Sequence, residues 1–75
     1  MVIPVERQPV KSRILRSVGY DAIAKNLEIE FHTGLVYQYS AVPPEVYTDL
    51  MHSSEIGKYF TEKVRTRFRT RQVVQ

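Results

Sequence analysis

The segment Asn26–Tyr39, with the sequence NLEIEFHTGLVYQY, decides the fold because it holds two strands and the turn that joins them. Leu27, Ile29 and Phe31 alternate with polar residues, which is the pattern of a strand buried on one face. The turn sets the register, since a shift of one residue moves every side chain to the opposite face of a sheet. The conformation of Gly34 therefore decides which strand residues enter the core.

Two turn geometries compete at this glycine. A two-residue turn pairs Ile29 with Gln38 and places the glutamine in the core. A three-residue loop with Gly34 in the left-handed conformation pairs Ile29 with Tyr37 instead. The second register leaves no polar side chain inside, so we predict a positive φ at Gly34 and a core position for Tyr37 and Tyr39.

Base stacking is a second role for the two tyrosines, as in sheets that bind RNA. Rings with that role lie on the open face of a sheet, and the predicted open face here carries Glu28 and Glu30, which repel phosphates. The register therefore favours core packing. It leaves Tyr39, near the end of its strand, as the ring most available for stacking.

The residues before the hairpin predict a further strand over Ser12–Tyr20. Ile14, Val18 and Tyr20 lie on one alternating face of this segment. Gly19 within it indicates a bulge or the close approach of another backbone segment.

Two helices are predicted after the hairpin. The first begins at Pro43 or Pro44, and Ser53 or Ser54 caps the second, in which Gly57 indicates close packing. Apolar residues at helical spacing mark their buried sides, Val46, Tyr47, Leu50 and Met51 in the first helix and Ile56, Phe60, Val64 and Phe68 in the second. The predicted fold class is α+β, a three-stranded antiparallel sheet followed by two helices packed on one face.

The chain has 75 residues and no cysteine. This length corresponds to one domain with a small core, and the lack of cysteine removes disulfides and thiolate metal sites. We expect a flexible arm over residues 1–10, one domain over 11–70 and a tail over 71–75. No apolar run reaches the ~18 residues of a membrane span, and the opening residues lack the order of a signal peptide, so we expect a cytoplasmic protein without a membrane partner.

Positive charge is concentrated at the two ends of the chain, although the net charge is only +3. Residues 58–75 carry six basic side chains against Glu62 alone, a net charge of +5. Such segregation predicts a surface that attracts polyanions, while a merely solvated helix face is the simpler interpretation. The candidate nucleic-acid-binding residues are Lys11, Arg13, Arg16, Lys58, Lys63, Arg65, Arg67, Arg69 and Arg71, the last six on the second predicted helix and its extension.

Several short motifs in the same order resemble the KTSC domain family: GYD, LEIEFHTGLVYQY, VPPEVYTDL, SEIGKYF and VRTRF. The similarity spans roughly residues 10–68, with Thr61 where the family tends to have asparagine. The structural motif that it identifies comprises Gly34, Tyr37, Tyr39, Tyr59 and Phe60. The family takes its name from the C-terminus of some lysyl-tRNA synthetases and also occurs as small stand-alone proteins. The resemblance implies no established activity, and it suggests RNA as a partner only through that attachment.

Catalytic and metal sites are not predicted. His32 shares a strand face with Glu30, and Asp49, His52 and Glu55 are spaced three apart, but neither set supplies the convergent ligands that zinc requires. Helix capping accounts for Ser53 and Ser54. We expect no cofactor and no enzyme activity.

The leading functional hypothesis is a small binding module that contacts RNA, tRNA included, through a basic C-terminal helix with help from Lys11, Arg13 and Arg16. The alternative is a protein-interaction module that docks another protein or a second copy of the chain. It would use an uncovered sheet edge or an apolar rim around Val36 and Val42.

Overall fold

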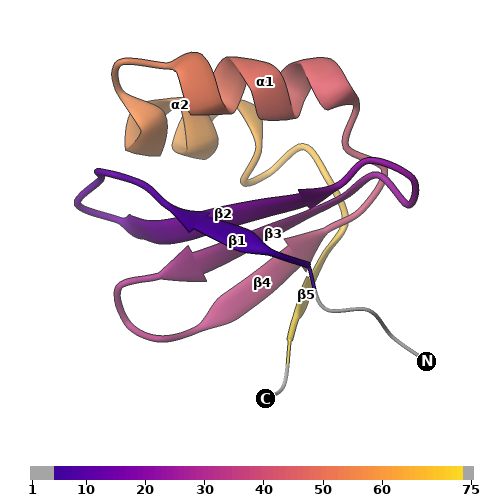
Figure 1. The fold of residues 1–75 in the computed structure, drawn as a ribbon, viewed down its shortest axis with the longest axis horizontal. Helices are drawn as coiled ribbons and strands as arrows, with labels where there is room; N and C mark the ends of the chain where they lie inside the picture. Colours follow the sequence, from indigo (N-terminus) through magenta and orange to yellow (C-terminus); the bar gives the residue numbers. More distant parts are fainter. Residues whose placement is uncertain (1–4, 74–75) are drawn as a thin grey trace.

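The structure of the chain is a computed structural model that describes residues 5–73. It consists of one antiparallel sheet of five strands in the order β1-β2-β3-β4-β5, with helices α1 and α2 above one face (Figure 1). The elements, in chain order, are β1 (Arg7–Pro9), β2 (Leu15–Asp21), β3 (Asn26–Phe31), β4 (Val36–Tyr39), α1 (Pro44–His52), α2 (Ile56–Lys63) and β5 (Thr70–Gln72). The α+β class and the placement of both helices on one face are confirmed, but the sheet has five strands rather than three.

The central hairpin has the predicted three-residue loop. Ile29 pairs with Tyr37 and Leu27 pairs with Tyr39. Gly34 has a φ of 93°, in the left-handed region, and its N–H donates to the carbonyl oxygen of Phe31. The register prediction is therefore confirmed, and Gln38 lies on the face opposite the helices.

The first helix forms as predicted, with Pro43 at its N-cap and Pro44 in its first turn. The second helix begins at Ile56, after Glu55, and Ser53 accepts a hydrogen bond from the N–H of Glu55 at 3.1 Å. Ser53 thus orders the chain just before the helix, although no side chain caps the helix itself. A methyl group on Gly57 would lie 2.9 Å from Ser12 Oγ, which confirms close packing at this glycine.

The predicted extension of the second helix past Lys63 is wrong. Phe60 O accepts hydrogen bonds from both Val64 N and Arg65 N, and Val64 leaves helical geometry with φ −120°. The chain then crosses beside the sheet to form β5, which pairs with β4 (Figure 1). Residues 70–72 gain hydrogen bonds at an open sheet edge that a longer helix would leave unpaired. Arg71 and Gln72 of the expected tail thus belong to the fifth strand, and residues 74–75 of that tail lie outside the described residues.

The other added strand, β1, lies within the segment expected to be a flexible arm. It pairs with β2 so that Arg7 lies opposite Gly19. Because Gly19 has no side chain, Arg7 reaches across it and forms an ion pair with Glu28 of β3. A methyl group on Gly19 would lie only 2.7 Å from the carbonyl oxygen of Glu6, so the predicted close approach is confirmed.

The core lies between the helices and the sheet. A register shift between Leu15 and Ser17 turns Leu15 toward the helices, so Ile14 is 45% exposed rather than part of the predicted core face. Tyr20 of β2 stacks on Tyr47 of α1 with ring centroids 4.8 Å apart. The fully buried residues of this cluster include Leu15, Val18, Leu27, Ile29, Val42, Leu50, Phe60 and Val64.

Candidate functional site

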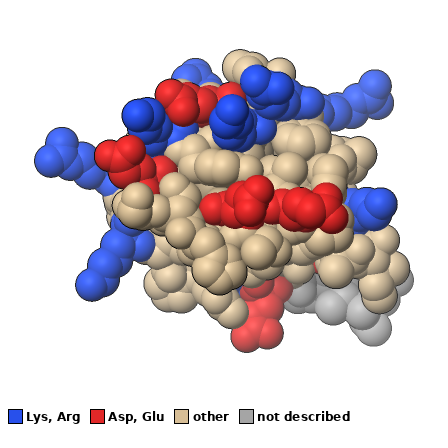
Figure 2. Space-filling model, turned by 90° about the horizontal axis from the view of Figure 1, so that it is seen from above, with Lys and Arg blue, Asp and Glu red and all other residues tan. Residues whose placement is uncertain are grey.

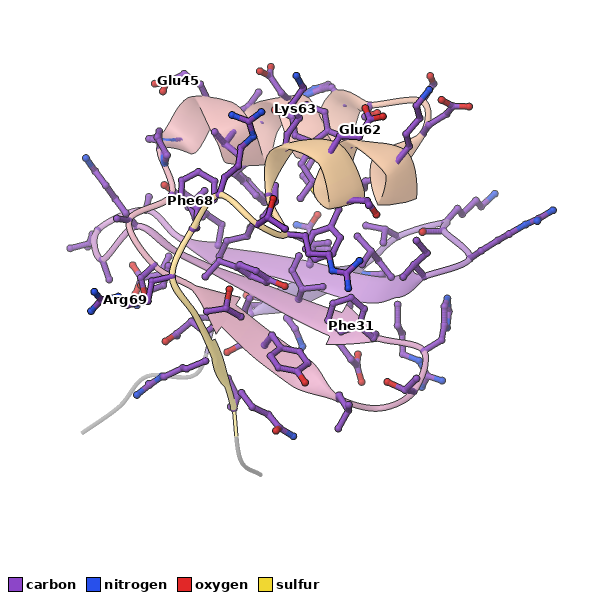
Figure 3. The ribbon with its side chains drawn as sticks, turned by 180° about the vertical axis from the view of Figure 1, so that it is seen from behind. Phe31, Glu45, Glu62, Lys63, Phe68 and Arg69 are labelled. Carbon is purple, nitrogen blue, oxygen red and sulfur yellow. The ribbon has the colours of Figure 1, made fainter. Side chains whose placement is uncertain are left out.

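An open cleft of about 690 Å³ lies between α2 and the end of the β3–β4 hairpin. Its floor consists of Phe31, Tyr37, Tyr39 and Phe60, and we call this hollow the aromatic cleft. Figure 3 shows Phe31 on the side of the sheet that faces α2. Phe60 makes edge-to-face contacts with Phe31 and Tyr39, each with centroids 5.6 Å apart. The floor is thus an extension of the core that opens to solvent.

The four rings differ in how much surface they present. Tyr39 and Phe60 are 3% and 1% exposed, whereas Phe31 and Tyr37 are half-buried. Phe31 and Tyr37 stand edge to face, with centroids 5.7 Å apart and planes at 76°. The accessible ring surface therefore belongs to Phe31 and Tyr37, and Tyr39 is not the available ring.

Two arginines reach the aromatic cleft from different segments. Arg13 comes from the connection between β1 and β2, and Arg65 from the turn after α2. His32, Thr61 and Thr70 add polar groups to the lining. The polar lining among the described residues contains no carboxylate, so the cleft combines apolar rings with positive charge.

The hydroxyls of the two threonines are already engaged. Thr61 Oγ1 donates to Gly57 O at 2.9 Å, and Thr70 Oγ1 donates to Phe68 O at 3.1 Å. A hydroxyl that donates its proton keeps lone pairs free to accept. Both threonines therefore present hydrogen-bond acceptors to a ligand.

Tyr39 is electrostatically linked to the arginine at the cleft. Burial raises the pKa of the Tyr39 phenol, and the positive charge of Arg65 opposes that rise. The phenol is neutral at physiological pH, and its ring forms part of the buried floor.

Polar and apolar side chains share the mouth of the aromatic cleft. Ile14 and Leu35 line it and are 45% and 44% exposed. In contrast, Val36 and Val42, the expected apolar rim, are 2% and 0% exposed, so that rim is absent. Ile14 and Leu35 instead expose apolar surface at the cleft, and Ile23, which is 98% exposed, lies apart from it in the loop between β2 and β3.

The opposite sheet face is polar and carries acidic groups. Arg7 pairs with Glu28, and Ser17 donates to Glu30 at 2.8 Å. A smaller hollow of about 370 Å³ on this face is lined in part by Arg16. The two faces of the sheet thus differ in chemistry, with aromatic rings on one and paired carboxylates on the other.

The sequence model of the KTSC domain matches residues 11–68. The chain belongs to the KTSC domain family. A KTSC domain protein from Yersinia pestis has a crystal structure that superposes with a TM-score of 0.91 at 32% identity, covering 95% of this chain and all of that one. The resemblance drawn from the sequence motifs is confirmed.

Relatives of this KTSC domain occur alone and inside a longer protein. An uncharacterized protein of Stutzerimonas stutzeri is 41% identical over 58 residues, which are 77% of this chain and 82% of the relative. A protein of Tsukamurella paurometabola is 39% identical over 83% of this chain and 92% of its own length. A lysine–tRNA ligase of Nostoc punctiforme is 32% identical over 80% of this chain, but the match covers 11% of the ligase. This is therefore a small KTSC domain.

The structure distributes the nine predicted basic residues over several surfaces. Arg13 and Arg65 line the aromatic cleft, whereas Arg16 lines the hollow on the opposite face. Arg71 pairs opposite Gln38 and so belongs to that opposite face as well. Lys11 is exposed in the connection from β1 to β2. These residues do not form one continuous row.

The remaining basic residues follow α2 and the turn after it. Lys58 lies 3.9 Å from a Glu55 carboxylate oxygen, and Arg67 Nε donates to Glu62 O at 3.4 Å. Figure 3 shows Lys63 pointing away from the sheet and Arg69 pointing outward, away from the helices. In Figure 2 basic side chains lie mainly toward the margin of the helix-covered surface, and acidic groups lie in its middle and also among the basic side chains at the margin.

The histidines bind backbone carbonyl groups. His32 Nε2 lies 2.8 Å from Ser12 O, and His52 Nδ1 lies 2.8 Å from Thr48 O. Within residues 5–73, no group of three or more His, Cys, Asp or Glu side chains is arranged to hold a metal ion. Over the same residues, no helix has the length and apolar character to cross a membrane.

Sequence reasoning missed the aromatic cleft, because its residues come from four separate segments. It also missed the end of the second helix at Lys63, which places Arg65 in the turn beside the cleft, because Val64 and Phe68 continue the apolar spacing of a helix.

Proposed function

We propose that this KTSC domain is a non-enzymatic module that binds single-stranded RNA in the aromatic cleft. The observation that carries the proposal is the placement of Arg13 and Arg65 beside half-buried aromatic rings. Proteins that bind single strands combine positive charge along the backbone with rings on which bases stack. Guanidinium groups suit phosphate oxygens because they donate in a planar fork.

The rest of the molecule is consistent with a one-sided site. Glu28 and Glu30 lie on the opposite face, where they disfavour a polyanion, and the mapped residues of the aromatic cleft include no carboxylate. The lining offers rings, arginines and threonines rather than a nucleophile paired with a base, so we propose binding and not catalysis. One relative is a lysine–tRNA ligase, which supports tRNA as one source of the single-stranded segment.

A pair of charge-matched variants tests this proposal. Arg13→Gln/Arg65→Gln removes both cleft arginines, and Arg16→Gln/Arg71→Gln removes two arginines from the opposite face. The net charge is equal in both, so the long-range attraction of RNA falls equally. We expect the cleft variant to lose at least about tenfold in affinity because two charge-assisted contacts vanish, and the control to lose no more than about threefold. Fluorescence anisotropy with a labelled oligouridylate and with tRNA measures both.

An equal loss of RNA affinity in the two variants would show that binding depends only on the net charge of the protein. A wild-type protein that binds neither RNA at low salt would contradict the proposal.

Docking of a protein is the second candidate, favoured by the exposed Ile14 and Leu35 at the mouth of the aromatic cleft. An apolar peptide side chain would lie against this surface. Salt separates the two candidates, because phosphate contacts weaken steeply with ionic strength and apolar docking hardly changes.

A further inference from the structure

The exposed rings of the aromatic cleft can receive one base of a ligand rather than a row of stacked bases. Tyr39 and Phe60 are covered, and the two half-buried rings, Phe31 and Tyr37, stand at 76° to each other. Successive stacked bases are parallel, so two perpendicular rings cannot each receive a neighbouring base of a continuous stack. A single base inserted between the hairpin and α2 meets the face of one ring and the edge of the other.

The charged groups at the aromatic cleft are also few. Arg13 and Arg65 line it, whereas Arg16 and Arg71 belong to the opposite face and Lys63 points away from the sheet. The two cleft arginines provide two guanidinium groups, which is enough for two phosphates. Each internal nucleotide of a strand has one phosphate on its 5′ side and another on its 3′ side. The two positive charges at the cleft therefore equal the number of phosphates that flank one nucleotide.

Two polar side chains of the lining, Thr61 and Thr70, do not distinguish one base from another. Thr61 and Thr70 present hydroxyl oxygens whose protons are already donated to backbone carbonyls. All four RNA bases carry an N–H donor on their pairing edge, so acceptors of this kind do not separate them. In a duplex this pairing edge is hydrogen-bonded to the opposite base. A base must therefore be unpaired and unstacked before its edge can reach the cleft.

We infer, building on the proposed function, that the aromatic cleft is a one-nucleotide site. It holds a single unpaired base of any sequence against Phe31 and Tyr37, with its two flanking phosphates at Arg13 and Arg65. The ligand class is therefore an unpaired nucleotide within a loop or a single strand, and a trinucleotide contains every group that the site contacts.

A length series tests this inference by competition against a labelled 12-mer of uridylate. UpUpU has two phosphodiesters around its central base, whereas UpU has one. We expect the trinucleotide to bind at least about fivefold more tightly than the dinucleotide, and the 12-mer, corrected for its overlapping registers, to match the trinucleotide within about threefold. The slope of log affinity against log salt is expected near −1.4, from about −0.7 for each of two single-strand phosphates. A 12-base-pair duplex is expected to bind at least about tenfold more weakly than the single strand.

Substitution of the ring provides a second measurement. Tyr37→Leu removes the aromatic surface and keeps an apolar side chain, and it is expected to weaken trinucleotide binding at least about fivefold. Tyr37→Phe keeps the ring and is expected to stay within about twofold of wild type. Circular dichroism verifies that both variants are folded.

The outcomes separate the site size from the proposed function. A 12-mer whose corrected affinity far exceeds that of the trinucleotide, with a slope of about −3 or steeper, would show an extended RNA path and overturn the one-nucleotide site while leaving RNA binding intact. A duplex that binds as well as the single strand, or unchanged binding by Tyr37→Leu, would likewise overturn it. Failure of every RNA to bind at low salt would overturn the proposed function itself.

Discussion

Gly34 shows how one residue fixes the register of the sheet. Its φ is 93°, and a methyl group built on it would meet no atom within 4 Å. The cost of a side chain here is therefore conformational rather than steric. We expect Gly34→Val to lower the free energy of unfolding by more than about 1 kcal/mol, because a β-branched residue resists the left-handed region. Gly34→Asn is expected to cost less, since asparagine tolerates that region. Urea denaturation measures both, and equal losses for the two variants would contradict this account.

The register is predictable from sequence because its causes are local. The alternation of Leu27, Ile29 and Phe31 identifies the buried face, and burial of Gln38 excludes the competing turn. The degree of exposure of Tyr37 and Tyr39 is not predictable in the same way. It depends on which ring α2 covers, and the contact of Phe60 with Tyr39 is a tertiary one.

At the scale of elements, attachment of β1 depends on the missing side chain of Gly19. A methyl group there would lie 2.7 Å from both Glu6 O and Val5 Cγ1, and backbone atoms cannot yield at low cost. We expect Gly19→Ala to push β1 from the sheet and to break the contact of Arg7 with Glu28. Hydrogen exchange of the amides that join β1 to β2 is expected to accelerate at least about tenfold. The amides between β4 and β5 serve as the internal control, and unchanged exchange at β1 would contradict the prediction.

The two edge strands mark the limit of sequence reasoning about elements. Each has three residues, and neither has the alternating apolar pattern that identifies a buried strand. Their stability comes from hydrogen bonds to strands that are distant in sequence. Phe68 illustrates the same limit, since it packs against the core as the helical stripe predicts, but from a turn after α2 has ended.

The whole molecule brings together what no single segment contains. The aromatic cleft combines the connection before β2, the β3–β4 hairpin, α2 with its following turn, and the start of β5. The sequence identifies Arg13 and Arg65 as basic candidates, but it cannot select them from nine. Only the topology separates these two from Arg16 and Arg71, which the sheet directs to its other face.

The chemical difference between the two faces of the sheet predicts which amide signals of the domain change when RNA is added. In a titration of the isotope-labelled protein with a short oligouridylate, we expect amide shifts to change around Arg13, Phe31, Tyr37 and Arg65. Amides at Glu28 and on β1 are expected to stay constant, because paired carboxylates on that face disfavour phosphates and charges more than ~10 Å away are screened at 0.1 M salt. The Arg13→Gln/Arg65→Gln variant serves as the control, since it should lose the shifts of the cleft without gaining any elsewhere. Shifts spread evenly over both faces would mean that RNA contacts the protein through its net charge of +3 and that the cleft has no special part in binding.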